Sequence, residues 1–127
     1  MKTIREDQRV ALVAQQAERV QLLRYLGGAL AEYELAKARA MLMLYIEAQR
    51  PHAELMLGEA HEQWRQRQAL WLPKLETANR EGQLLGETAL RDAGIDPDAP
   101  GTDYQIDHQT GAILRLESGA WVPIMEQ

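Results

Sequence analysis

Cysteine and phenylalanine are both absent from this 127-residue sequence, and serine occurs once, as Ser118. Without cysteine the chain has no disulfide, no thiolate metal ligand and no cysteine nucleophile. Valine is also scarce, whereas leucine and alanine are the commonest residues. Because Leu and Ala favour helices while Val and Phe favour strands, this composition predicts a mainly helical protein.

Long apolar runs are missing as well. The N-terminal residues MKTIREDQRVALV lack the apolar core of a secretory signal peptide. The longest uninterrupted apolar run, Ala40 to Ile46, is far shorter than the roughly 20 residues needed to span a bilayer. We therefore expect a protein that is cytoplasmic when synthesised, with no signal peptide and no transmembrane helix.

Positive charge is outnumbered by negative charge. The chain has 14 Lys and Arg against 19 Asp and Glu, a net charge of −5, and the negative excess lies in residues 51–127. Nucleic-acid-binding proteins usually concentrate basic residues on one face, because release of counterions drives their affinity. No such concentration is visible in the sequence, so we expect no nucleic-acid partner.

The first predicted helix covers roughly Asp7 to Arg50, a stretch without proline. Apolar residues first recur there at steps of three and four residues, at positions 10, 13, 17 and 20. From Ala29 to Ala48 they point to all sides of the helix, as in helices that are buried on more than one side. A small chain has few elements that could surround such a helix, so the pattern favours burial by neighbouring copies or by a partner.

A second helical segment is predicted from Pro51 to about Leu72, since proline is tolerated in a first turn. Pro73 is expected to kink this helix or to start a new one. Helical character continues to Leu90, and Gly94 is expected to cap the C-terminal end. Residues 1–94 are thus predicted to form a helical hairpin or bundle. The predicted apolar face of the second segment consists of Ala53, Leu57, Ala60, Trp64, Gln68 and Trp71.

Residues 95–102 form a turn-rich linker, and residues 103–127 are predicted to be a small antiparallel β-hairpin that acts as a docking element. Strands are expected at residues 104–106 and 112–116, with residues 121–124 as an optional third strand. The hairpin holds more apolar side chains than one face of two strands can hide, so we expect it to pair with another chain. The alternative is that it covers the helices of its own chain, with Trp121 near Trp64 or Trp71.

No group of residues forms a recognisable catalytic or metal-binding pattern. His52 and His61 are nine residues apart, which places them on opposite sides of a helix, and His108 lies in the expected hairpin turn. Ser118 is outside any nucleophile-elbow context, and Gly27–Gly28 lacks the Lys-Ser/Thr of a phosphate-binding loop. We therefore expect no enzymatic activity, no metal and no cofactor.

Tryptophan and apolar surface residues are the best candidates for contacts with other chains, because tryptophan is enriched at protein interfaces. Packing inside the chain is the alternative for the three tryptophans. The candidate interface residues are Leu30, Tyr33, Met41, Leu42, Leu44, Tyr45, Trp64, Trp71, Ile113, Leu116 and Trp121.

The hypothesis that accounts for these features is a non-enzymatic structural or assembly protein. It would act as a homo-oligomer with itself, and with other protein subunits of a larger complex, as its partners. A bacteriophage particle is one such complex, in which the chain would be a head–tail, tail or internal ejected protein. Two alternatives stay open. One is a small acidic module that inhibits a basic protein surface through residues 91–127; the other is a membrane-active amphipathic helix in residues 1–50.

Elemental analysis of the purified protein is expected to find no stoichiometric zinc, iron or manganese, because the three histidines share no geometry for one ion. One bound ion per chain would contradict this expectation and would reopen the hypothesis of an enzyme.

Overall fold

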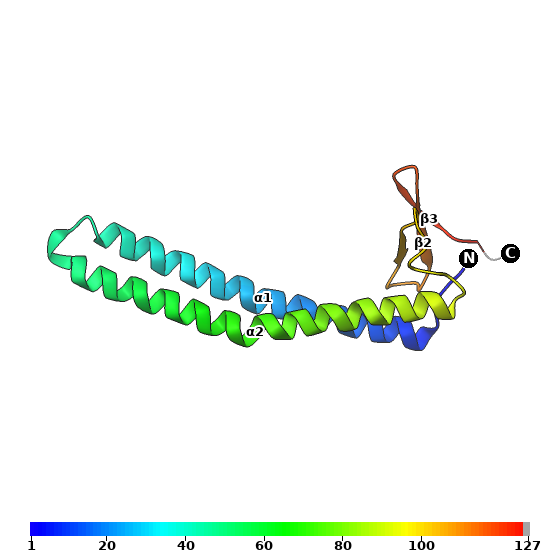
Figure 1. Ribbon diagram of the computed structural model, residues 1–127, viewed down its shortest axis with the longest axis horizontal. Helices are drawn as coiled ribbons and strands as arrows, with labels where there is room; N and C mark the ends of the chain where they lie inside the picture. The colour runs from blue at the N-terminus through cyan, green and yellow to red at the C-terminus, as the bar shows by residue number, and fades with distance from the viewer. Residues whose placement is uncertain (126–127) are drawn as a thin grey trace. The chain divides into compact units, whose positions relative to one another are not determined.

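The computed structural model describes residues 1–125, which form two long helices followed by a three-stranded sheet (Figure 1). Helix α1 spans Glu6–Met43, the short 3-10 helix η1 spans Glu47–Gln49, and helix α2 spans Arg50–Asp92. Strands β1 (Tyr104–Ile106), β2 (Ile113–Glu117) and β3 (Ala120–Pro123) follow. The predicted fold class, mainly helical with a small C-terminal antiparallel element, is confirmed, and the optional third strand is present.

The chain divides into two compact units. The hairpin unit is Arg19–Thr77, and the sheet unit combines Met1–Glu18 with Ala78–Gln127. This division differs from the expected helical domain 1–94, linker 95–102 and docking element 103–127. The reason is that the first turns of α1 and the last turns of α2 pack with the sheet.

In the hairpin unit, α1 and α2 run side by side in opposite directions (Figure 1). The buried and half-buried residues of α1 recur at alternating steps of four and three, which is the spacing of two helices that pack along one seam. Ala53 and Ala60 of α2 are buried in the same unit, and their small side chains let the two backbones approach closely. We call this side the inner face of α1; it consists of Leu22, Leu26, Ala29, Tyr33, Ala36 and Ala40.

The inner face is not the face that the start of the first helix suggested. Val10, Val13 and Val20 are exposed, whereas Leu12 and Leu22 are buried. Both sets recur every three or four residues, so periodicity alone did not show which of them faces inward. By contrast, the face predicted for the second helix is the packed one, since Ala53 and its predicted companions are buried or half-buried.

The helix ends also differ in part from the prediction. Helix α1 ends at Met43 rather than at Arg50, and the backbone turns through residues 44–46 before η1. Helix α2 continues through Pro73, so no new helix starts there. The predicted cap at Gly94 is confirmed: its φ is +83°, and the N–H of Ile95 donates to the carbonyl of Leu90 at 2.9 Å.

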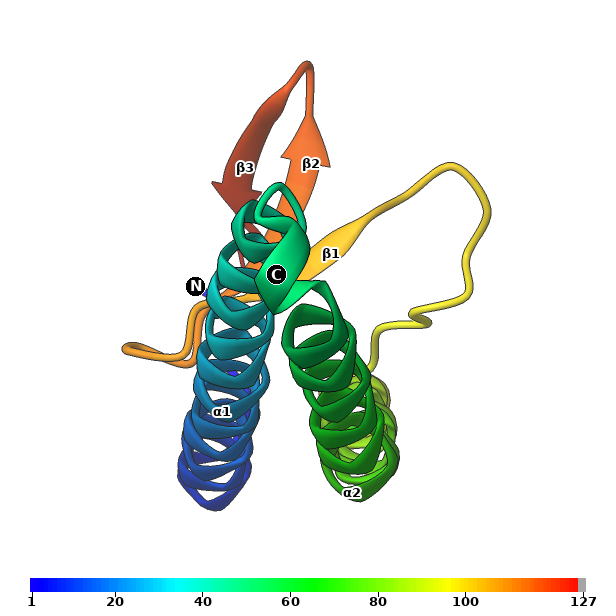
Figure 2. The same cartoon turned by 90° about the vertical axis from the view of Figure 1, so that its left-hand side faces the viewer.

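The sheet has the strand order β1-β2-β3, with β2 in the middle (Figure 2). The segment before α1 extends it, because Thr3 forms a bridge with Ala112 and the N–H of Ile113 donates to the carbonyl of Lys2 at 3.0 Å. Figure 2 shows β2 and β3 joined by a tight turn, where Ser118 and Gly119 have φ values of 50° and 81°. The sheet therefore includes residues from both ends of the described chain.

One apolar cluster holds the sheet unit together. It brings strand residues and helix residues into contact, so the start of β2 packs within its own chain, which is the alternative given for the hairpin above. The physical reason is that Ile113 begins β2 at the point where the sheet meets the helices, and it is fully buried there. Docking to another chain stays a prediction. The cluster consists of Ile4, Leu12, Ala89, Leu90, Ile95 and Ile113.

The substitution Ile113→Ala is expected to lower the free energy of unfolding by about 2–5 kcal/mol, because it leaves a cavity in the cluster. Urea denaturation followed by circular dichroism measures this change. Leu116→Ala is the matched control on the same strand, because Leu116 is 38% exposed. A loss of stability at residue 116 as large as the loss at residue 113 would contradict the assigned core.

Candidate interaction surface

Aromatic rings connect the two helices of the hairpin unit. Tyr33 of α1 stacks on Trp64 of α2 with ring centroids 5.9 Å apart and an interplanar angle of 17°. Tyr25 stacks on Trp71 at 5.0 Å and 28°. The hydroxyl of Tyr33 also lies 2.8 Å from Nδ1 of His61. These rings therefore have partners within their own chain.

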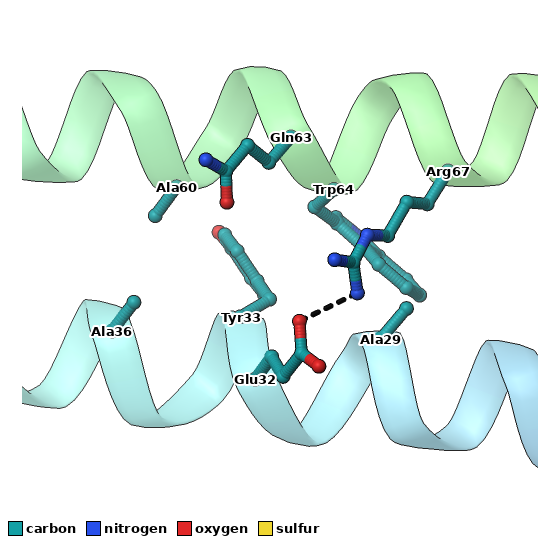
Figure 3. Close-up of a pocket in the computed structure, with 8 residues that line it drawn as sticks. All are labelled: Ala29, Glu32, Tyr33, Ala36, Ala60, Gln63, Trp64 and Arg67. Carbon is teal, nitrogen blue, oxygen red and sulfur yellow. Dashed lines mark hydrogen bonds and ion pairs between the residues drawn. The ribbon is translucent and has the colours of Figure 1, made fainter.

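Charged groups surround the stacked rings. The ammonium of Lys37 lies 5.4 Å from the ring centroid of Tyr33, and that of Lys74 lies 4.7 Å from the ring centroid of Trp71. An ion pair between Glu32 of α1 and Arg67 of α2 crosses the seam beside the Tyr33 ring (Figure 3). These contacts stabilise the antiparallel register of the two helices, and they give the ring cluster a structural role.

The space beside this cluster is too small for a substrate. Figure 3 shows the ring of Tyr33 pointing across the seam toward α2, with Ala29 and Ala36 on either side of it along α1. The cavity has a volume of about 30 Å³, which is room for water but not for an organic ligand. Within residues 1–125 no group of three or more His, Asp or Glu side chains is placed to hold a metal ion.

A wider hollow lies in the sheet unit. It has a volume of about 420 Å³, is open to solvent and is lined by five residues. Glu81 is the only titratable residue among them, so the hollow lacks the second group that general acid–base chemistry needs. The lining residues are Gln8, Glu81, Leu84, Leu85 and Thr88.

Most of the exposed large apolar residues of the hairpin unit belong to α1, and six of them lie away from the side that packs against α2. Leu35 is 53% exposed there and Leu42 is 69% exposed. Gly27 and Gly28 lie between the larger residues, and a Cβ atom added to either would meet no atom within 4 Å. We call this side the outer face of α1; its large apolar residues are Val20, Leu23, Leu30, Leu35, Met41 and Leu42.

Two smaller apolar regions are also exposed. After α1, Tyr45 is 89% exposed and Ile46 is exposed beside it in the turn before η1. On the sheet, Leu116 of β2 lies directly opposite Trp121 of β3, and Trp121 is 44% exposed. Trp121 is therefore a surface residue, unlike the half-buried Trp64 and Trp71.

The eleven predicted interface residues fall into three groups. The exposed ones are Leu30, Met41, Leu42, Tyr45, Leu116 and Trp121. The half-buried ones are Tyr33, Leu44, Trp64 and Trp71. Ile113 is fully buried inside its own chain, which corrects its assignment to an interface.

Sequence reasoning missed Val20, Leu23 and Leu35 as members of the exposed surface. The signal was present, because the early period at residues 10, 13, 17 and 20 continues along α1 as Gly27, Ala31 and Ala38. The period by itself does not show which side of α1 packs against α2, so the sequence did not single out these three residues.

No protein-family model matches this sequence, and neither the curated proteins nor the solved structures contain a match to it. None of the helices in the part of the chain that the structure describes is both long and apolar enough to cross a membrane.

The substitution Trp64→Ala is expected to destabilise the hairpin unit by about 3 kcal/mol, because it removes the stack with Tyr33 and leaves a cavity at the seam. Trp121→Ala, which removes the same side chain from an exposed position, is expected to cost less than about 1 kcal/mol. Thermal unfolding followed by circular dichroism compares the two variants. Equal losses would contradict the assignment of Trp64 to the interior and Trp121 to the surface.

Proposed function

We propose that this chain is a non-enzymatic assembly protein that associates with further copies of itself through the outer face of α1. The observation that carries the proposal is that six large apolar side chains remain exposed on this face when the hairpin unit is folded. Contiguous exposed apolar surface is uncommon on monomeric proteins and is typical of surfaces that bind another protein.

The energetics favour association along this face. Each Å² of apolar surface that is removed from water contributes about 25 cal/mol. Several exposed leucines along a single helix therefore contribute more to the free energy of association than any one isolated residue does. The helix that carries them is already ordered in the folded chain. A second copy supplies a matching apolar surface without any other component, which is the usual route to a homo-oligomer.

An acidic inhibitory module is less well supported, because acidic residues of the sheet unit have partners in the chain. Asp92 accepts a hydrogen bond from Gln8 at 2.7 Å and lies 3.4 Å from Arg5. Asp98 forms an ion pair with Arg91 at 3.0 Å, and Glu117 forms one with Arg115. These pairs reduce the negative charge that could face a basic partner.

A bacteriophage particle is one setting that repeats a small chain many times, and incorporation into a virion is a more specific form of the same proposal. Peptide mass spectrometry on purified particles tests this setting separately. Absence of the chain from the particles would contradict incorporation into a virion. It would not bear on self-association, which has its own experiment.

The substitutions Leu42→Glu and Leu35→Glu are expected to abolish self-association, because an unpaired carboxylate that is buried between chains costs several kcal/mol. Both residues are exposed in the folded chain, so neither change should alter the helical circular dichroism signal of the dilute protein. Sedimentation equilibrium across micromolar concentrations measures the oligomeric state.

Leu70→Glu is the matched control, because Leu70 is 53% exposed on α2 rather than on α1. This variant should associate like the wild type. A wild-type protein that remains a monomer at every concentration would falsify the proposed function, and loss of association in the Leu70 variant would show that α1 is not the surface responsible.

A further inference from the structure

The outer face of α1 carries a regular row of residues at its centre. Within the hairpin unit these residues follow one another at steps of four, three, four, three and four, which is a second heptad seam on the same helix. Successive residues of a helix are separated by about 100°, so this row lies roughly opposite the inner face. The row consists of Val20, Arg24, Gly27, Ala31, Glu34 and Ala38.

We propose that two copies of this chain pack along this row in antiparallel orientation, about a twofold axis level with residue 29. Arg24 of each copy then lies against Glu34 of the other. This inference rests on the proposed function, and it adds the orientation and the register of the contact.

The pairing of charges favours this register. Arg24 and Glu34 are the only charged residues of the row, and they lie at equal distances along the helix on either side of residue 29. With a twofold axis at this level, Arg24 of each copy faces Glu34 of the other. Both charges of the row then lie against an opposite charge. Arg24 forms no ion pair with any other residue among residues 1–125, whereas Glu34 lies 3.6 Å from Lys37 at the rim of the face.

The sizes of the side chains fit the same register. Gly27 of one copy meets Ala31 of the other on both sides of the axis, so the two backbones can approach closely at the centre. Val20 meets Ala38, which places a larger side chain against a small one. Leu30, one residue from the axis and exposed, lies beside Leu30 of the second copy along one flank of the seam.

Other arrangements leave the charges unmatched. A parallel pair in register would place Arg24 against Arg24 and Glu34 against Glu34. An antiparallel pair shifted by one heptad would place Arg24 against Gly27 or against Met41. Burial of an unpaired charge costs far more than a small change in apolar contact, so these arrangements are disfavoured.

Charge reversal tests the predicted pairs. Arg24→Glu should weaken dimerisation at least about tenfold, because each dimer would gain two Glu–Glu contacts, and Glu34→Arg should do the same. The double variant Arg24→Glu with Glu34→Arg restores opposite charges and should return to within about threefold of the wild-type affinity. Arg39→Glu changes the net charge equally but lies off the row, so it should leave dimerisation unchanged.

Cross-linking tests the orientation. Because the chain has no native cysteine, any disulfide must join the introduced thiols. A mixture of the variants Val20→Cys and Ala38→Cys should form a disulfide-linked heterodimer on oxidation. Ala38→Cys alone should not cross-link, because its two copies would lie about 27 Å apart along the antiparallel helices, beyond the roughly 7 Å that a disulfide can span.

The outcomes separate this inference from the proposed function. If the wild type associates but the double variant is not rescued, or if Ala38→Cys alone cross-links, the register is wrong while self-association stands. If the wild type is monomeric, both proposals fail. A chain that stays monomeric in solution yet binds vesicles of anionic phospholipid would assign the outer face to a membrane surface and would also overturn the inference.

Discussion

The hairpin unit depends on how closely its two helices approach one another. Alanine at positions 53 and 60 of α2 removes side-chain bulk from the seam, so the backbone of α1 can lie near α2. At that separation the rings of Tyr33 and Trp64 are brought face to face, and the ion pair between Glu32 and Arg67 can form across the seam. A larger residue at position 60 would push the helices apart and would disturb all of these contacts together.

The same close packing explains why α1 has an unpartnered side. A single neighbouring helix covers only a stripe of the surface of α1, and the apolar residues of this helix are distributed over more than that stripe. Once α2 has covered Leu22 and Leu26, residues such as Leu35 and Leu42 remain outside. This excess of apolar surface was predicted from the sequence, and the structure shows on which side of the helix it lies.

Much of the fold could be predicted from local signals, and the errors arise where distant residues decide the outcome. Proline at position 51, the cap at Gly94 and the turn before Ala112 mark element ends through local backbone chemistry, so those boundaries were close to correct. Two sets of apolar residues on α1 share the helical spacing, and only the packing of α2 decides which set faces inward. The burial of Ile113 depends on Ile4 and Leu12, which are distant in the sequence. The strand sequence alone therefore could not show that Ile113 is buried. Among the candidate residues, Leu30, Met41 and Leu42 are exposed on the outer face, whereas Tyr33, Trp64 and Trp71 have ring partners across the seam.

The bridge between Thr3 and Ala112 has a consequence for the order in which the molecule forms. Contacts in the hairpin unit close a short loop and can therefore form early, whereas the sheet unit must join segments that nearly the whole described chain separates. Until those segments meet, Ile4 and Ile113 do not pack together, and the N–H of Ile113 lacks its acceptor, the carbonyl of Lys2. Because closing the longer loop costs more entropy, we expect the hairpin contacts to form before the first residues join the sheet.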